Sequence, residues 1–302
     1  MLSQQDLPKV RGQYRFNYPI SKTSWFRTGG PAEVLFKPED KNDLIDFLKN
    51  KPQSLNVTTL GVCSNVIVRK GGIKGVLIKL GRGFSDIKIT DSKNNLISAG
   101  AGALDVNVAK LAAENSISGL EFLIGIPGTV GGAVSMNAGA YESQISDILT
   151  SATAIDLNGN IRELQNKDFG FKYRRHCLDE ELIFTEVTLQ GNKGDSKEIT
   201  RKMQQISAMR ETTQPVRART GGSTFKNPEN SDKKAWQLID EAGCRGLRIG
   251  QVKVSEKHCN FLINEGSENS EDIEKLGEEV KKRVKEHSGI ELNWEIKRIG
   301  ED

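Results

Sequence analysis

The chain has 302 residues, more than one hydrophobic core usually supports, so we expect two or three domains. Its 43 Lys and Arg residues nearly balance its 40 Asp and Glu residues, which argues against a broadly basic surface for nucleic acid. No apolar run approaches the roughly 20 residues of a membrane helix, and the polar N-terminal segment lacks the apolar stretch of a signal peptide. We therefore expect a cytoplasmic protein with neither nucleic acid nor membrane as a partner.

The cysteines and histidines are scattered along the chain. The four cysteines form no CxxC pair, and the three histidines have no metal-ligand spacing. We therefore expect buried free thiols, with no structural metal and no disulfide framework.

The first part of the chain alternates turn signals with short strands. A Gly-Gly-Pro turn leads into a strand that ends near residue 36, and Asp40 precedes a helix with an apolar stripe. Strands are predicted at 57–61, 65–68 and 76–80.

The middle of the chain predicts a helix-bearing antiparallel sheet. A period-two pattern from residue 86 indicates paired strands, and apolar residues at helical spacing follow over 104–111. Asn158-Gly159 is a strong hairpin signal between 151–156 and 161–164. A strand over 182–189 and a helix with Ile199, Met203 and Ile206 on one face complete this block.

The last part of the chain begins at Gln214-Pro215, where the residue before proline disfavours helix. We predict a helix over 233–242 that ends at Gly243. A longer amphipathic helix runs from Ser270, which we expect to cap it, to Gly289. A final strand is predicted over 292–299.

Residues 125–141, the glycine-rich segment, contain five glycines among seventeen residues and almost no charge. This composition is not that of a core helix. Pro127-Gly128 fits the centre of a type II turn, and Gly131-Gly132 would leave successive N–H groups pointing at one anion. A tight crossover without a ligand explains the segment about as well.

Neither common nucleotide motif is present. The segment lacks the Gly-x-Gly-x-x-Gly spacing of a Rossmann turn and the Gly-Lys-Ser/Thr of a P-loop. A dinucleotide would therefore need another architecture, in which residues 61–65 and 125–132 hold the pyrophosphate together.

Six motifs occur in the order found in one enzyme family, and together they cover nearly the whole chain. The chain closely resembles the UDP-N-acetylenolpyruvoylglucosamine reductase (MurB) family, in its shorter subtype. The motifs are Phe26-Arg-Thr-Gly-Gly-Pro31, Gly61-x-x-Ser-Asn65, Gly119 to Ala133, Met136-Asn-Ala-Gly-Ala140, Tyr173-Arg174 and Gly222-Ser-Thr-Phe-Lys-Asn-Pro228.

The resemblance implies an α+β fold, with a two-part FAD-binding region of the vanillyl-alcohol-oxidase/PCMH type and a smaller α/β substrate-binding domain. The implied boundaries are 1–81 and 82–213 for the FAD-binding subdomains and 214–302 for the substrate domain. The implied activity is NADPH-dependent reduction of an enolpyruvyl UDP-sugar in peptidoglycan synthesis, by a cytoplasmic monomer. Two alternatives are a related FAD oxidase of another alcohol or ether and a nucleotide-binding module without activity.

The resemblance also implies which residues bind the cofactor and the substrate. Tyr173, Lys226 and Asn227 are the candidate substrate contacts. The expected FAD-binding residues are Gly61, Cys63, Ser64, Asn65, Gly128, Thr129, Gly131, Gly132, Asn137, Ala138, Gly139 and Ala140.

Three residues match the family's catalytic positions. Ser223 is the expected proton donor, although Ser-Thr beside Gly-Gly is otherwise typical of a turn or cap. Arg174 suits the substrate carboxylate, on which negative charge accumulates, although an Arg pair is often simply solvated. Glu295 is expected to polarise the site or relay a proton, with Glu291 as a competing candidate.

Several details stay open at this level. Cys63 replaces a common glycine and His176 a usual serine, and the role of His258 is not fixed. At least one of three arginines is expected to contact the UDP diphosphate, either Arg210, Arg217 or Arg219.

Overall fold

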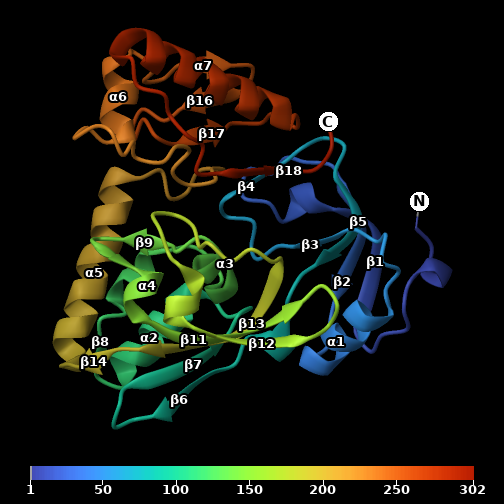
Figure 1. Cartoon of the computed structure of the whole chain (residues 1–302). Coiled ribbons are helices and arrows are strands. Elements are labelled where there is room, and N and C mark those ends of the chain that lie inside the picture. Colours follow the sequence, from blue (N-terminus) through green and yellow to red (C-terminus); the bar gives the residue numbers. More distant parts are fainter. Residues whose placement is uncertain (1) are drawn as a thin grey trace. The chain divides into compact units, whose positions relative to one another are not determined.

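The computed structural model describes residues 2–302, which form two compact units (Figure 1). The first unit comprises the chain up to Phe16, Val34–Gly61 and Gly75–Met209. The second comprises Asn17–Glu33, Val62–Lys74 and Arg210–Asp302. The division into three domains stays a prediction.

The smaller layer of the first unit is a four-stranded sheet with one helix. The sheet has the order β1-β2-β5-β3, and β3 and β5 are parallel. Its elements are β1 (Gln13–Pro19), β2 (Pro31–Lys37), α1 (Lys41–Asn50), β3 (Val57–Thr59) and β5 (Ile73–Ile78).

Helix α1 packs on this sheet through its apolar stripe. Leu44 and Phe47 are fully buried in one cluster with Phe36 and Val76. The helix begins where it was predicted, because the Asp40 side chain accepts a hydrogen bond from the Asp43 N–H (2.9 Å).

The larger layer is an antiparallel sheet with the order β12-β11-β13-β7-β6. The predicted hairpin is confirmed, with Gly159 at φ +81° between β11 and β12. Helix α3 packs against β7 and β13 on one face (Figure 1). The bounds are β6 (Ile87–Asp91), β7 (Leu96–Gly100), α2 (Asp105–Glu114), α3 (Val130–Ser135), α4 (Ile145–Ile148), β11 (Leu149–Asp156), β12 (Ile161–Gln165), β13 (Leu182–Gln190) and α5 (Ser196–Thr213).

Short elements connect these layers. Two small antiparallel pairs, β9 with β10 and β8 with β14, lie in the first unit. The bounds are η1 (Gln4–Asp6), η2 (Ile20–Lys22), η3 (Arg82–Phe84), β8 (Ile117–Ser118), η4 (Glu121–Gly125), β9 (Gly139–Ala140), β10 (Ser143–Gln144), η5 (Asn166–Phe169) and β14 (Asn192–Lys193).

The glycine-rich segment differs from its predicted conformation. Gly131 and Gly132 lie in α3, and Gly128 does not have the positive φ of a type II turn. Helix is possible here because Gly131 packs against Ala101, where a Cβ would lie 2.9 Å from the Ala101 Cβ. Close packing, which local composition does not encode, decides the conformation.

The second unit packs α6 and α7 on a three-stranded sheet, β15-β16-β17, around one apolar cluster (Figure 1). A parallel pair, β4 with β18, joins residues 66–68 to 297–299. The bounds are β4 (Val66–Val68), α6 (Ala235–Glu241), β15 (Arg248–Ile249), β16 (Val252–Val254), β17 (Leu262–Asn264), α7 (Ser270–Ser288) and β18 (Lys297–Ile299).

Two predictions for this unit were wrong in detail. The cap of α7 is Asn269, whose side chain accepts from the Glu271 N–H (3.0 Å), whereas Ser270 is the first helical residue. The last strand covers only Lys297–Ile299 of the predicted 292–299, because β4 supplies a paired edge only there. Gly289, at φ +74°, ends α7 as expected.

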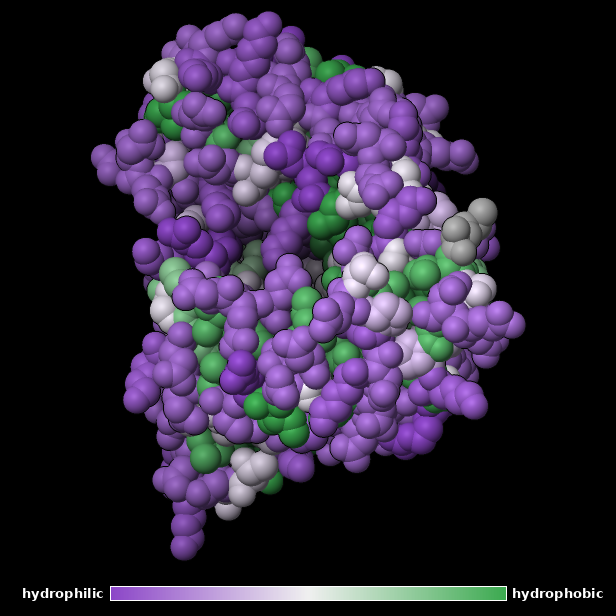
Figure 2. All heavy atoms as spheres, turned by 45° about the vertical axis from the view of Figure 1, so that its right-hand side comes forward, coloured by the Kyte–Doolittle hydropathy of each residue, from purple (hydrophilic) through white to green (hydrophobic). Residues whose placement is uncertain are grey.

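Large exposed apolar side chains occur on several elements of the described chain. Large exposed apolar side chains in residues 2–302 include Ile161, Met209 and Trp236, which lie on different elements. The face in Figure 2 is mainly hydrophilic. Within this described range, no helix has both the length and the apolar character needed to cross a membrane. The four cysteines, which all lie in the described range, form no disulfide, and Cys177 is exposed, contrary to the expectation of buried thiols.

Candidate active site

The two predicted cofactor loops meet in the first unit. Gly61 lies against Thr129, because a Cβ on Gly61 would be 2.4 Å from Thr129 Oγ1. A side chain at residue 61 would require the Thr129 side chain to move. The chain continues into the second unit through Cys63, which is buried at φ +56°. This left-handed conformation is the one that glycine accepts most readily, so Cys63 is under backbone strain that glycine would avoid.

The backbone of the glycine-rich segment is anchored on residues 101–103. The Val130 N–H donates to Ala103 O and the Gly131 N–H donates to Ala101 O, each at 2.9 Å. These two N–H groups are therefore used inside the protein, which corrects the picture of a free anion nest. Gly132 is exposed, and the nearest atom to a Cβ there would be Thr129 Oγ1 at 3.4 Å. The space beside residue 132 would therefore admit a side chain, although the residue is glycine.

Asn137 shapes the next part of this segment. Its side chain is 1% exposed and its φ is +44°. The side-chain amide donates to Lys172 O (3.1 Å), and its oxygen accepts from the Ser146 N–H (2.9 Å). Asn137 therefore ties the segment to the turn that carries Arg174.

Arg174 is placed directly against a predicted cofactor residue. Its Nη2 donates to Gly139 O (2.8 Å), and its guanidinium carbon lies 4.9 Å from the centre of the Tyr173 ring. The turn is closed by reciprocal backbone bonds between Lys172 and Arg175. The structure thus positions Arg174 by its own anchor and does not leave it as part of a solvated Arg pair.

His176 is held by the fold. Its Nδ1 accepts from the Leu178 N–H (3.3 Å), and its ring packs edge-on against Phe169 and Phe184. The His176 side chain is therefore accommodated by aromatic packing.

Ser223 lies in the second unit, in an extended segment between two others. Ser223 pairs with Phe261, and the Thr224 N–H donates to Asn260 O (2.8 Å). The buried Asn260 side chain accepts from the Phe225 N–H (2.9 Å) and donates to Phe225 O (2.8 Å). This clamp fixes the backbone on the C-terminal side of Ser223.

Glu295 reaches the other side of the same segment. The Glu295 N–H donates to Thr224 O (2.8 Å), and the Asn65 side-chain amide donates to Glu295 O (3.2 Å). Glu295 is therefore linked to the side chain of Asn65 and, through Thr224, to the residue that follows Ser223. The competing Glu291 is exposed and forms an ion pair with Lys285 (3.2 Å).

The predicted substrate residues of the second unit flank this segment. The Lys226 N–H donates to Asn293 O (2.8 Å), and Asn227 Oδ1 accepts from the Ala235 N–H at the start of α6 (3.0 Å). The side chain of Asn227 thus has a structural partner. Lys226 and Asn227 are both half-buried.

His258 packs next to the partner of Ser223. Its ring centre lies 4.7 Å from that of Phe261, and its Nδ1 accepts from the Asn260 N–H (3.3 Å). Burial lowers the pKa of the His258 imidazole, so the neutral ring is favoured. This arrangement supports a structural role.

The three arginines before Ser223 differ in their surroundings. Arg210 Nε donates to Gln214 Oε1 (3.2 Å) at the end of α5, whereas Arg217 and Arg219 are exposed. The Arg219 backbone carbonyl accepts from the Asn264 N–H (2.9 Å).

Two residues near the predicted site were missed by sequence reasoning. Asn260 lies in the stretch 254–264, to which the sequence alone assigns no role. Asp105 has the ordinary appearance of an acidic residue in the first turn of a helix, so no sequence signal distinguishes it.

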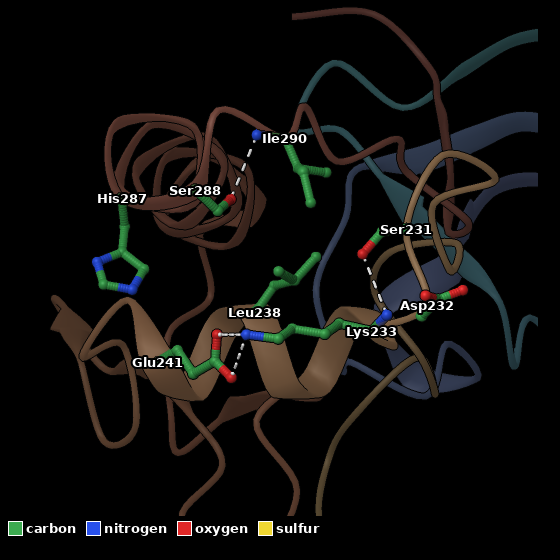
Figure 3. A pocket seen from close by; sticks show the side chains of 8 residues that line it. All are labelled: Ser231, Asp232, Lys233, Leu238, Glu241, His287, Ser288 and Ile290. Carbon is green, nitrogen blue, oxygen red and sulfur yellow. Dashed lines mark hydrogen bonds and ion pairs between the residues drawn. The ribbon is translucent and has the colours of Figure 1, made fainter.

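The second unit also has a surface hollow of about 470 Å³, lined by side chains from α6, α7 and the loop before α6 (Figure 3). Lys233 and Glu241 form an ion pair within it (2.7 Å). None of the predicted site residues lines this hollow, so we do not assign the substrate to it. Its lining comprises Ser231, Asp232, Lys233, Leu238, Glu241, His287, Ser288 and Ile290.

Comparison with known proteins decides the family. Residues 32–165 match the FAD binding domain, and residues 214–299 match the UDP-N-acetylenolpyruvoylglucosamine reductase C-terminal domain. The UDP-N-acetylenolpyruvoylglucosamine reductase of Parvibaculum lavamentivorans is 53% identical over 97% of this chain and 93% of its own length. The one from Gluconobacter oxydans is 51% identical over 99% and 97%. The chain belongs to the UDP-N-acetylenolpyruvoylglucosamine reductase family.

A solved structure of this family agrees with the fold. The crystal structure of the MurB reductase from Thermus caldophilus superposes with a TM-score of 0.81, at 31% identity, over 97% of this chain and 100% of that one. The predicted α+β fold, with an FAD-binding region and a smaller C-terminal domain, is confirmed.

FAD is the cofactor of this family member, which is an oxidoreductase. The residues present fit such a group, because a side chain at residue 61 would collide with Thr129 and Gly132 leaves exposed backbone in the same segment. Among residues 2–302 there is no group of three or more His, Cys, Asp or Glu side chains placed to hold a metal ion.

Proposed function

We propose that this chain reduces UDP-N-acetylenolpyruvoylglucosamine to UDP-N-acetylmuramate with NADPH, a step of peptidoglycan synthesis. The observation that carries the proposal is the link of Glu295 to Asn65 and, through Thr224, to the segment that carries Ser223, in a chain whose whole length matches reductases of this name.

FAD, when bound, accepts hydride from NADPH and supplies it to one alkene carbon of the substrate. We assign the binding of FAD to the two loops that meet at Gly61 and Thr129. The full set is Gly61, Cys63, Ser64, Asn65, Gly128, Thr129, Gly131, Gly132, Asn137, Ala138, Gly139 and Ala140.

Ser223 gives the proton to the neighbouring carbon. A hydroxyl is a weak acid, but an enol or carbanion carbon is basic enough to take its proton when the two are held in position. The Asn260 clamp and the bond from Glu295 to Thr224 supply that positioning. Lys226 favours the resulting alkoxide through its positive charge.

Arg174 binds the substrate carboxylate, on which charge accumulates as hydride arrives. Its bond to Gly139 O orients the guanidinium before substrate binds. Glu295 polarises the site or relays a proton, while Tyr173 and Asn227 contact the substrate. One or more of Arg210, Arg217 and Arg219 binds the diphosphate.

The remaining parts of the proposal come from the family. They are a cytoplasmic, monomeric enzyme, three domains with boundaries at residues 81 and 213, and a role in cell shape and cell division through the cell wall.

A substrate-dependent assay tests the proposal. The purified protein should be yellow, and NADPH oxidation should depend on added UDP-N-acetylenolpyruvoylglucosamine. Oxygen consumption with a simple alcohol or ether, without that dependence, would instead support the related FAD oxidase.

A further inference from the structure

Asp105, the first residue of α2, has a buried carboxyl group that receives no hydrogen bond within residues 2–302. Its side chain is 0% exposed, and across residues 2–302 neither carboxyl oxygen has a hydrogen-bond partner. A buried acid of this kind is expensive to retain, and no step of the proposed reaction uses it.

The Asp105 carboxyl lies against the glycine-rich segment. The Asp105 backbone N–H donates a hydrogen bond to Gly128 O (3.2 Å), and a Cβ on Gly128 would be 2.9 Å from Asp105 Oδ2. The carboxyl therefore occupies the space that a side chain at residue 128 would need. Leu104 pairs with Thr129 beside it, so the start of α2 and the segment pack as one body.

No positive charge compensates the Asp105 carboxyl. Burial is the single cause that raises its pKa well above the usual value, so the uncharged form is favoured. Residues 101–104 and 126–135 carry no titratable side chain. Besides Asp105, the titratable groups on α2, β8 and η4 are Lys110 and Glu114, both exposed, and Glu121, which accepts from the Gly119 N–H (2.8 Å) and lies 3.6 Å from Lys202 Nζ. Helix α5 contacts α2 near its opposite end, where Ser196 Oγ donates to Ala113 O (2.7 Å).

We propose that Asp105 is a positioning residue for FAD, which holds the glycine-rich segment closed while it is uncharged and weakens FAD binding when it ionises. A charged Asp105 can regain hydration only if its packing against residue 128 opens. Its negative charge would also repel the anionic pyrophosphate of FAD. The inference rests on the proposed assignment of residues 128–132 to FAD.

Linkage makes the proposal measurable. If ionised Asp105 weakens FAD binding, then bound FAD must favour the protonated form, and binding must take up protons. The FAD dissociation constant should rise with pH, by at most about tenfold per pH unit for one proton.

The experiment measures FAD affinity by flavin fluorescence between about pH 6 and pH 10, the range above an ordinary carboxyl pKa in which the protein is handled. We compare the wild type with Asp105→Asn, which keeps the shape and removes the charge, and with Glu114→Gln on the same helix. We expect the pH dependence to flatten only in Asp105→Asn. Profiles that stay parallel in all three proteins would overturn the proposal.

Two further measurements protect the test. If Asp105→Asn does not fold, calorimetry of FAD binding to the wild type in two buffers of different ionisation enthalpy still reports proton uptake, and equal heats would overturn the proposal. Gly132→Ala separates the assumption from the inference. Unchanged FAD affinity in Gly132→Ala would reject the location of FAD, whereas the pH profiles of Asp105→Asn address Asp105 alone.

Discussion

The region assigned to FAD and the region assigned to proton transfer are built in opposite ways. In the first unit, the glycine-rich segment presents backbone, and a side chain at residue 61 or 131 would collide with its neighbours. In the second unit, Ser223 and Glu295 present side chains from segments joined by main-chain bonds. Substitutions that add side-chain atoms should disrupt the first region, whereas substitutions that remove a functional group should disrupt the second.

This difference follows from what each region must do. A large anionic cofactor is held by close approach of the backbone, for which small residues are required. Proton transfer instead needs a particular side chain at a fixed position. The FAD region therefore depends on where residues are small, whereas the proton-transfer region depends on which side chain stands at each position.

The largest effect is expected from Ser223→Ala. Turnover should fall by about 10²- to 10⁴-fold, because the proton donor is lost. Flavin reduction by NADPH should survive, since it does not use this hydroxyl. Stopped-flow absorbance of the flavin separates the two steps, and Ser231→Ala, at a half-buried loop serine of the same unit, is the control. Unchanged turnover in Ser223→Ala would show that another group donates the proton.

Asn260→Ala removes the clamp next to Ser223. Two buried backbone groups of Phe225 lose their partners, so the free energy of unfolding should fall by about 2–4 kcal/mol. Denaturant melts measure this loss, with the exposed Asn230→Ala as a control. If the stability is unchanged while turnover falls, Asn260 acts in the reaction and not through the backbone.

Most elements and the family could be predicted from the sequence. The helix that begins after Asp40, the hairpin at Asn158-Gly159 and the amphipathic helix that ends at Gly289 follow from local rules, and each is present. These features depend on neighbours in sequence, which is why they could be predicted.

Contacts between distant segments could not be predicted. The helix at Gly131 depends on Ala101, and the short β18 depends on where β4 ends. The orphan carboxyl of Asp105 depends on Gly128, while its sequence context is that of an ordinary helix start. Motif likeness found Ser223 and Glu295, but only the structure shows that Thr224 connects them.

Adjacent glycines provide a paired test of the first region. Gly131→Ala forces a Cβ against Ala101, so the free energy of unfolding should fall by about 1–3 kcal/mol. Gly132→Ala meets only Thr129 at contact distance, so the fold should tolerate it, while FAD affinity falls roughly 10- to 100-fold. Thermal melts and flavin fluorescence distinguish the two. If both variants have the same stability and lose the same FAD affinity, the proposed difference between Gly131 as a packing residue and Gly132 as a cofactor contact is wrong.

Asp105 is a side chain in the region that otherwise uses backbone, and its stability effect has a defined sign. Because burial raises its pKa in the folded state, the folded protein binds more protons than the unfolded chain. Its contribution to stability is therefore present below the ordinary carboxyl pKa and is lost as pH rises towards the raised value, with a slope of at most about 1.4 kcal/mol per pH unit.

Asp105→Asn should remove this slope, so the variant should gain stability relative to the wild type as pH rises. Asp91 is the contrasting control. Hydrogen bonds from Asn94 lower the pKa of its exposed carboxyl, so its contribution is lost as pH falls. Urea melts across pH should therefore move in opposite directions for Asp105→Asn and Asp91→Asn. If Asp105→Asn is instead less stable than the wild type by the same amount at every pH, the Asp105 carboxyl has an interaction partner in solution. The glycine-rich segment would then depend on a side-chain interaction, as the segment that carries Ser223 does.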